Sequence, residues 1–404
     1  MKKIWCLLFL SVCCLSGADK RPIFTSGPKP VGPYTPGIIA GDFLYVSGQG
    51  ARSADNKISP VFEEQVRQTL ENVKTIVEAA GLTMEHVVYT QLYLVDTSKY
   101  GEMNKIWTQY FKKDPPARAT VGVYRMPVDT PVEVTAVAVM DLSKKKVILP
   151  PGYPANAPVS PGVMAGERLY LSGFLGRNIN TGQIPENLGD QVQLALDRMK
   201  ATLTAAGMDF RHMVFINPYL TEKMPMGIMN KIYAQHFEFG NTPARATIKV
   251  NSLPSGANIE FTGVAIRDLA KRVAVRPKNM PPSPTASPCV FAGDTLFCSA
   301  KSAFIPGPMS GIYFEDVETQ VRMSMRNLLD GLEEAGMDFS NVVATNVYLD
   351  NMDEFSKMNG TYAKYFRTLP PTRTTVSPEA PVERKKSESG AWPKIEEISL
   401  IAVK

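Results

Sequence analysis

Residues 116–121 read PARATV, residues 243–248 read PARATI and residues 371–376 read PTRTTV. The arginines of these stretches, Arg118, Arg245 and Arg373, are 127 and 128 residues apart. Such a period is too long for a solenoid repeat and matches the size of a small domain. A chain of 404 residues is also too long for a single hydrophobic core. The sequence therefore predicts three tandem copies of one domain.

Each copy combines strands and helices in the same order. In copy one, residues 38–48 predict a hairpin that turns at Gly41. Apolar residues then recur at steps of three and four from Val66 to Ala80, which predicts a helix that ends at Gly81. The remaining elements are expected at 86–95 (strand), 100–111 (helix), 117–123 (strand) and 132–140 (strand). The helices of the other copies are expected at 191–206, 227–237, 317–335 and 355–366. The order β-β-α-β-α-β-β predicts an α+β fold, with two helices on one face of a sheet.

The repeats divide the chain into an N-terminal segment and three domains. We assign residues 1–18 to a signal peptide, 19–144 to copy one, 145–272 to copy two and 273–404 to copy three, which carries an insertion within 377–394. Linkers are expected at about 142–154 and 270–284, and four prolines make the second one stiff and extended. Three tethered copies can cover the sheet faces and edges that one copy would expose. We therefore expect an intrachain pseudo-trimer. Such an assembly needs only one chain, so the protein can be a monomer.

The N-terminus has the pattern of a secretory signal peptide. Two lysines precede an apolar run at residues 4–15, and small residues at 16–18 offer a cleavage site. The run is too short to span a bilayer. A lipoprotein signal with a lipidated Cys13 or Cys14 is the less favoured alternative, because Val12 stands where a small residue is wanted. We expect an exported protein, periplasmic or secreted, that has no membrane association after cleavage.

Two cysteines remain after the signal, and they flank a predicted turn. In a hairpin that turns at residues 293–294, Cys289 and Cys298 face each other at a position without mutual backbone hydrogen bonds, where side chains approach most closely. In an oxidising compartment they can form a disulfide. The alternative is a pair of buried small apolar residues.

Composition excludes several function classes. The chain is 44% hydrophobic and 21% charged, and its net charge of +5 is spread along the sequence. Its dense basic run at 384–386 lies near Glu383 and Glu388 and is typical of a solvated loop, so no nucleic-acid partner is expected. His86 and His212 occupy equivalent positions in different copies, and no Cys/His spacing suggests zinc. No metal site is expected.

Several spaced motifs of copy one resemble the RidA family (YjgF/YER057c/UK114). They are VGPY at 31–34, VSGQ at 46–49, MN at 103–104, PPAR at 115–118 and VEV at 132–134. Copy two matches nearly as well and copy three less so. The resemblance implies a homotrimer-like assembly with ligand clefts between domains, here within one chain. It also implies hydrolysis of reactive enamines and imines, such as 2-aminoacrylate, to 2-keto acids and ammonia without a metal or organic cofactor.

The resemblance further implies a set of site residues. The family arginine maps onto Arg118, Arg245 and Arg373, and the family glutamate maps onto Glu133, Glu260 and Glu397. The family serine maps onto Ser47, Ser172 and Ser299, the asparagine onto Asn104, Asn230 and Asn359, and the tyrosine onto Tyr34.

These residue types suit the chemistry of a 2-imino acid. Arginine holds a carboxylate bidentately, glutamate can orient a water and move its protons, and serine and asparagine add orienting hydrogen bonds. We assign catalysis to Glu133, Glu260 and Tyr34, and substrate binding to Arg118, Arg245, Arg373, Asn104, Asn230, Ser47 and Ser172. The alternatives are interface salt bridges for the arginines, and turn or helix-surface roles for the serines and asparagines.

The copies differ at functional positions. Tyr34 has no counterpart in the other copies, where Val159 and Ala286 stand. The glutamate follows the arginine by 15 residues in copies one and two and by 24 in copy three. Gly48 corresponds to Ala300 in copy three. We therefore expect one or two working clefts, with copy three partly structural.

Four functions are compatible with the sequence. The leading one is an exported enamine/imine deaminase that acts on a small imino acid. The second is a non-catalytic protein that binds small carboxylates in the same clefts, which the missing tyrosines and the export signal favour. An RNA-acting protein is opposed by the lack of a basic, aromatic-lined stripe. A purely structural fusion is the fourth.

Overall fold

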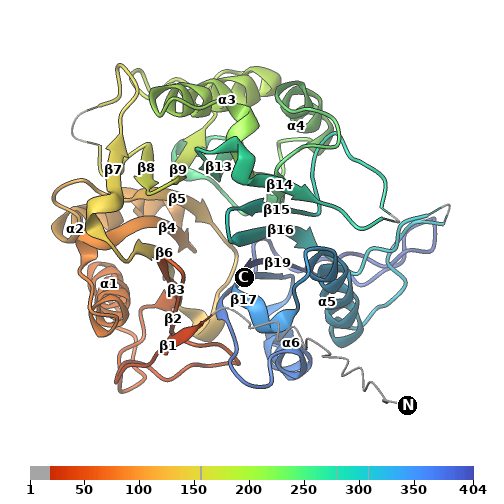
Figure 1. Cartoon of the computed structure of the whole chain (residues 1–404). Coiled ribbons are helices and arrows are strands. Elements are labelled where there is room, and N and C mark those ends of the chain that lie inside the picture. The colour runs from red at the N-terminus through yellow and green to blue at the C-terminus, as the bar shows by residue number, and fades with distance from the viewer. Residues whose placement is uncertain (1–18, 155–156, 279, 308) are drawn as a thin grey trace, which may run out of the picture.

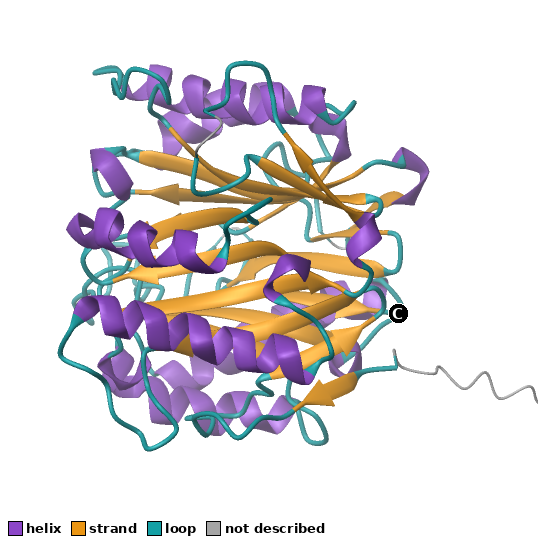
Figure 2. Cartoon of the chain, turned by 90° about the vertical axis from the view of Figure 1, so that its left-hand side faces the viewer, coloured by secondary structure: helices purple, strands orange, loops and turns teal. Residues whose placement is uncertain are grey.

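The computed structural model describes residues 19–154, 157–278, 280–307 and 309–404. The segment predicted to be a signal peptide lies outside these ranges. The three copies form a ring around a central axis, with their sheets toward the axis and their helices outside (Figure 1). Figure 2 shows the same arrangement from the side, with helices covering the outer faces of the strands. The predicted α+β fold and intrachain pseudo-trimer are confirmed.

Copy one contains a six-stranded sheet of order β1-β2-β3-β6-β4-β5. Its strands are β1 (Arg21–Ile23), β2 (Gly37–Ala40), β3 (Phe43–Gly50), β4 (Val87–Leu94), β5 (Ala117–Gly122) and β6 (Val132–Val139), and its helices are α1 (Phe62–Ala79) and α2 (Tyr100–Tyr110). β4 and β5 are parallel, and α2 makes the crossover between them. The other neighbouring strands are antiparallel.

Copies two and three repeat this plan. Copy two consists of β7 (Lys145–Ile148), β8 (Gly162–Ala165), β9 (Arg168–Leu175), α3 (Leu188–Ala205), β10 (Met213–Leu220), α4 (Met226–Tyr233), β11 (Ala244–Arg245), β12 (Ile248–Lys249) and β13 (Ile259–Ile266). Copy three consists of β14 (Arg272–Val275), β15 (Cys289–Ala292), β16 (Thr295–Lys301), α5 (Val317–Glu334), β17 (Val342–Leu349), α6 (Phe355–Tyr362), β18 (Thr372–Val376) and β19 (Glu396–Val403). The strand after Arg245 is interrupted in copy two, where β11 and β12 pair separately with β10.

The predicted linkers are partly strands, which corrects the sequence interpretation. β7 and β14 lie inside the expected linkers and pair with β8 and β15, at the edges of the sheets of copies two and three. Arg272, assigned to copy two from the sequence, therefore begins a strand of copy three. Pairing of these segments satisfies backbone groups that the hairpin edge would otherwise leave open. Two predicted helices are also shorter, because α4 and α6 end in a 3₁₀ turn.

Both faces of each sheet are buried. On the outer face each copy has its own core between sheet and helices, built in copy one around residues such as Leu70, Val73 and Trp107. On the inner face the three copies share a core to which all of them contribute, for example through Tyr45, Tyr170 and Phe297. This two-sided burial explains why β13 is buried along its whole length.

Neighbouring copies are joined in a closed ring. β5 of copy one lies beside β9 of copy two, β11 of copy two beside β16 of copy three, and β18 of copy three beside β3 of copy one. The last contact joins the first and last copies, whose red and blue segments are neighbours in Figure 1. Within the described ranges, none of the helices combines the length and the apolar character that a bilayer span requires.

Candidate functional site

The three repeated arginines mark the three junctions between copies. The backbone N–H of Arg118 donates to Ser172 Oγ at 2.8 Å, that of Arg245 to Ser299 Oγ at 2.7 Å, and that of Arg373 to Ser47 Oγ at 2.9 Å. Each serine hydroxyl donates its own proton to a backbone carbonyl twelve residues earlier, at 2.6–2.7 Å. The serines thus join an arginine strand to the neighbouring copy, and their hydroxyl protons are already engaged.

This junction decides which glutamate meets which arginine. Arg373 of copy three influences the pKa of Glu133 of copy one, and Arg118 of copy one influences that of Glu260 of copy two. Arg118 and Glu133 are 15 residues apart in the sequence, yet they face different clefts. We call the three sites the Arg373 pocket, the Arg118 cleft and the Arg245 cleft.

The Arg373 pocket is formed by copies one and three. Its lining includes Tyr34, Gly48, Arg52 and Glu133 of copy one, and Arg373 with Phe355 of copy three. Arg373 is only 4% exposed, and it lies among the rings of Tyr34, Phe355 and Tyr362, 5.0–5.5 Å from their centroids. A Cβ added at Gly32 would lie 2.5 Å from Arg373 Nη2, so the glycine lets the covering loop lie directly on the guanidinium.

The guanidinium of Arg373 is available for a ligand. It donates no hydrogen bond to any residue that the structure describes, and its Nη1 is buried without a partner. The nearby Asn359 Oδ1 is also buried and unsatisfied in the described part of the chain. Unsatisfied buried donors are costly unless a ligand completes them. None of the three repeated arginines forms an ion pair with a described carboxylate, so the salt-bridge alternative receives no support.

Glu133 gives the pocket a carboxyl group that is largely protonated at neutral pH. Burial raises its pKa from about 4.5 to about 8, and the positive charge of Arg373 only partly opposes this shift. Burial raises the pKa of the Tyr34 hydroxyl as well. The charges of Glu133, Arg373 and Arg52 also influence this pKa. That hydroxyl accepts a hydrogen bond from the Val31 N–H at 3.3 Å. A buried cation, an uncharged carboxyl group and a phenol therefore face one space.

The Arg118 cleft has similar groups, but its arginine is engaged by neighbouring side chains. Arg118 is 3% exposed, and its Nη2 donates to Asn104 Oδ1 at 2.7 Å and to Tyr100 Oη at 3.1 Å. Burial raises the pKa of Glu260 to about 8, and its Oε1 accepts a hydrogen bond from the Thr120 N–H. The arginine of this cleft is thus already held by side chains of its own copy.

Two residues of the Arg118 cleft escaped the sequence analysis. The first is Tyr153, from the loop before β8. Burial raises its pKa to about 12, and the positive charges of Arg198 and Arg118 partly oppose this shift. It brings a phenol to the cleft in which Val159 replaces the family tyrosine. Arg198 occupies the helix position of Asn72 and makes matching bonds to two backbone carbonyls. An alignment of α1 with α3 places Arg198 at the position of Asn72, and this equivalence could have identified Arg198 from the sequence.

The glutamate of the Arg245 cleft, Glu397, is less deeply buried than Glu133 and Glu260. Strand register places Glu397 opposite Tyr348, as Glu133 is opposite Tyr93 and Glu260 opposite Tyr219. Glu397 nevertheless pairs with Lys394 at 2.6 Å.

Ala300 accounts for the different position of that glutamate. A Cβ added at Gly48 would lie 2.7 Å from Glu133 Cδ, and one added at Gly173 would lie 2.5 Å from Glu260 Cδ. The space that the other two carboxyl groups use is therefore occupied by the methyl group of Ala300. Arg245 remains half-buried, with Nη1 donating to Asn230 Oδ1 at 2.7 Å.

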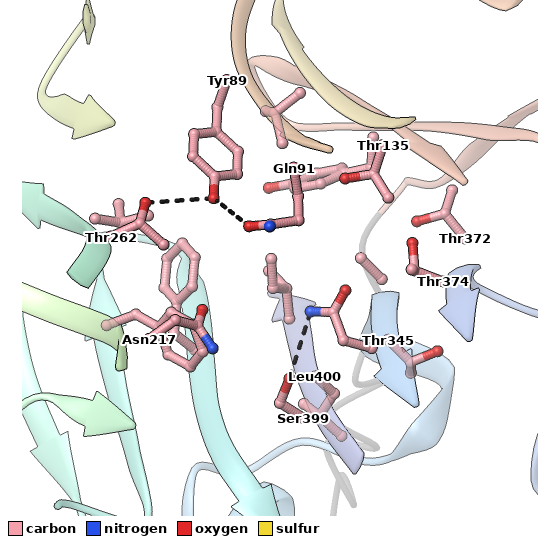
Figure 3. Close-up of a pocket in the computed structure, with 18 of the residues that line it drawn as sticks. Tyr89, Gln91, Thr135, Asn217, Thr262, Thr345, Thr372, Thr374, Ser399 and Leu400 are labelled. Atoms are coloured by element: carbon pink, nitrogen blue, oxygen red, sulfur yellow. Dashed lines mark hydrogen bonds between the residues drawn. The ribbon is translucent and has the colours of Figure 1, made fainter. Parts of the chain in front are cut away.

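A further cavity lies on the axis between the three sheets (Figure 3). Tyr89 Oη donates to Gln91 Oε1 at 2.9 Å and lies 3.3 Å from Thr262 Oγ1, while Gln91 Nε2 has no partner among the described residues. Apart from Arg373, which also lines the Arg373 pocket, its described lining is uncharged. Its described lining therefore contains no carboxyl group.

Two other sequence expectations concern cysteine and metals. The structure joins Cys289 and Cys298 by a disulfide, in the cross-strand register that the hairpin predicts. No group of three or more His, Cys, Asp and Glu side chains that could hold a metal ion occurs in the part of the chain that the structure describes.

Comparison with known proteins defines the class of this chain. The sequence model of the family described as Endoribonuclease L-PSP matches residues 24–140, 152–267 and 279–384. A RutC family protein of Saccharolobus solfataricus is 43% identical over 124 residues, which is 30% of this chain and 97% of that protein. The 2-iminobutanoate/2-iminopropanoate deaminase of Dermatophagoides farinae is 32% identical over 128 residues, which is 31% of this chain and 99% of that protein. The solved structure of E. coli TdcF with bound serine is 32% identical, with a TM-score of 0.29, and the match covers 30% of this chain and 99% of that one.

The three matches repeat the period seen in the sequence and together cover most of the chain. The chain belongs to the RidA family (YjgF/YER057c/UK114), with three tandem copies of the family domain.

Proposed function

We propose that this protein hydrolyses 2-imino acids to 2-oxo acids and ammonia in the Arg373 pocket. One observation carries the proposal: the free guanidinium of Arg373 and the protonated carboxyl group of Glu133 line the same pocket from different copies. The name of the Dermatophagoides farinae relative, a 2-iminobutanoate/2-iminopropanoate deaminase, supports the same reaction.

The residues divide the reaction between binding and proton transfer. Arg373 holds the substrate carboxylate through its unused N–H groups. Glu133 gives its proton to the imine nitrogen, which makes the imine carbon electrophilic, and the resulting carboxylate takes a proton from the water that attacks this carbon. Collapse of the carbinolamine breaks the C–N bond and releases ammonia and the 2-oxo acid. Tyr34 orients the substrate through its hydroxyl group.

A second candidate is non-catalytic binding of small carboxylates. It is favoured by the other two junctions, where asparagines hold Arg118 and Arg245, and by the pairing of Glu397 with Lys394 in the Arg245 cleft. The two functions differ in the role of Glu133, since carboxylate binding needs Arg373 but not a proton donor.

The deciding experiment is an imine hydrolysis assay on residues 19–404. An amino-acid oxidase generates the imine, and semicarbazide competes for it as a trap. We expect turnover by the wild type, and loss of turnover in Arg373→Ala and Glu133→Gln. If the folded wild type shows no turnover but binds 2-oxobutyrate, and Glu133→Gln binds it equally well, the binding function replaces the proposed one.

The cellular setting remains part of the proposal. We infer an exported protein whose partner is a small molecule and whose trimer-like ring is complete within one chain. The Cys289–Cys298 disulfide supports export, because disulfides persist in oxidising compartments.

A further inference from the structure

A second arginine lines the Arg373 pocket. Arg52 follows the end of β3 and contributes to the same lining as Arg373 and Glu133. Its guanidinium donates to the backbone carbonyl of Lys29, in the loop that covers the pocket. The positive charges of both arginines act on the hydroxyl of Tyr34, which lines the same pocket.

The two arginines differ in depth. Arg373 is almost fully buried, whereas Arg52 is partly exposed and its hydrogen bond to Lys29 lies at the surface. Neither forms an ion pair with a carboxylate in the described ranges. Because Glu133 is largely protonated near pH 7, it does not offset their charge. The lining of the pocket therefore carries two positive charges, one on the buried Arg373 and one on the partly exposed Arg52.

The fold does not require an arginine at this position. By the spacing of the Ser-Gly turns, Arg52 corresponds to Phe304 in copy three, where Asn327 still bonds to the carbonyls of Ser302 and Phe304. Asn72 already fixes the backbone here through bonds of 2.9 Å to the carbonyls of Gly50 and Arg52. The charge of Arg52 is thus free to serve a ligand.

We propose that the Arg373 pocket selects 2-imino acids that carry a second carboxylate. Arg373 holds the carboxylate next to the imine carbon, and Arg52 holds the distal carboxylate near the mouth. A monocarboxylic substrate leaves Arg52 without a counter-ion, while a dicarboxylic one neutralises both cations. This inference rests on the proposed function, because it names the substrate class of the same pocket.

The kinetic test compares imines generated from aspartate and glutamate with imines generated from alanine and 2-aminobutyrate. We expect kcat/KM to be about 10–100-fold higher for the dicarboxylic imines, the factor that a charge-assisted contact provides. In Arg52→Gln this preference falls about tenfold or more, and Arg52→Lys restores part of it. Arg67→Gln, an exposed arginine of α1, is the matched control and keeps the preference. Equal use of both classes by the wild type, or an unchanged preference in Arg52→Gln, would overturn the inference.

A binding measurement separates this inference from the proposed function. Calorimetry with 2-oxoglutarate and 2-oxobutyrate reads the selectivity of the pocket without any turnover. Tighter binding of 2-oxoglutarate that depends on Arg52 supports the inference even if no imine is hydrolysed. Hydrolysis of monocarboxylic imines alone, with no Arg52-dependent preference in either assay, leaves the proposed function standing and refutes the substrate class.

Discussion

The backbone N–H of Arg373 donates a hydrogen bond of 2.9 Å to Ser47 Oγ, across 326 positions of the sequence. Ser47 Oγ donates in turn to the carbonyl of Thr35, the neighbour of Tyr34. Glu133 is paired with Gly50, which lies on the same strand as Ser47. One junction between the first and last copies therefore brings Tyr34, Glu133 and Arg373 into a single pocket.

This arrangement predicts that substitution of the three repeated arginines affects imine hydrolysis to different extents. Arg373→Ala is expected to lower kcat/KM for imine hydrolysis by roughly 100-fold or more, because a buried guanidinium that binds the substrate carboxylate is lost. Arg245→Ala is the matched control and should stay within about twofold of the wild type, since the glutamate of its cleft, Glu397, pairs with Lys394. Arg118→Ala should keep more than half of the activity, because Arg118 is engaged by Asn104 and Tyr100. Loss of most activity in either control, with Arg373→Ala active, would place the reaction in another cleft.

The sequence predicts the repeated domain well but not the pairing of its site residues. Landmarks at a constant step identify the copies and their order of elements, because each copy must bury the same two faces. The match of Arg373 with Glu133 depends on which copies are neighbours across each junction, and that is a property of the ring. The contribution of the most diverged copy, which supplies the arginine of the Arg373 pocket, therefore could not be predicted from the sequence.

Two other features could not be predicted from the sequence. In one, a loop supplies a phenol from a position that does not align with Tyr34, and in the other, an alanine occupies the space of a carboxyl group. Tyr153 brings a phenol to the Arg118 cleft from a sequence position that does not align with Tyr34. The change from Gly48 to Ala300 was visible in the sequence, but its meaning requires the position of the neighbouring carboxyl group.

Gly48 offers a direct test of Glu133. Gly48→Ala places a methyl group against the carboxyl group, so Glu133 must leave its position and kcat/KM should fall about 100-fold. The fold should survive, because copy three carries alanine at the equivalent position. Gly173→Ala is the matched control in the Arg118 cleft and should have little effect on turnover. Circular dichroism confirms folding of both variants, and full activity of Gly48→Ala would show that Glu133 is not required where it lies.

The raised pKa of Glu133 predicts how turnover depends on pH. The group must be protonated to act as the acid, and its pKa in the free protein is about 8. We therefore expect kcat/KM, corrected for the uncatalysed reaction, to fall as the pH rises through about 8. The falling limb should be absent from the residual activity of Glu133→Gln. A wild-type rate that increases through pH 8 would contradict the role of an acid.

Buried Glu396 predicts a pH effect on stability outside the site. Burial raises its pKa to about 8, and Ser324 donates a hydrogen bond to it. The folded protein keeps this proton above pH 4.5 whereas the unfolded chain loses it, so the free energy of unfolding falls as the pH rises from about 4.5 to 8. One such group contributes at most about 1.4 kcal/mol per pH unit.

Glu396→Gln should remove the part of the pH-dependent loss of unfolding free energy that Glu396 causes. Urea denaturation at pH 5.5 and pH 8 should show a smaller loss of stability in the variant than in the wild type. Glu388→Gln, an exposed carboxylate of the same copy, is the matched control and should behave as the wild type. Parallel behaviour of all three proteins would mean that Glu396 is charged in the fold.

The Cys289–Cys298 disulfide should be present in the exported protein and should stabilise copy three. Alkylation without reduction should add no mass, and alkylation after reduction should modify two thiols. Closing a loop of this length, with a sequence separation of nine residues, contributes at most about 2–3 kcal/mol. Replacing both cysteines by serine should lower the unfolding free energy by up to this amount, because the unfolded chain regains the entropy that the cross-link removes. Two thiols that react without reduction would show instead that these residues act only as small buried side chains.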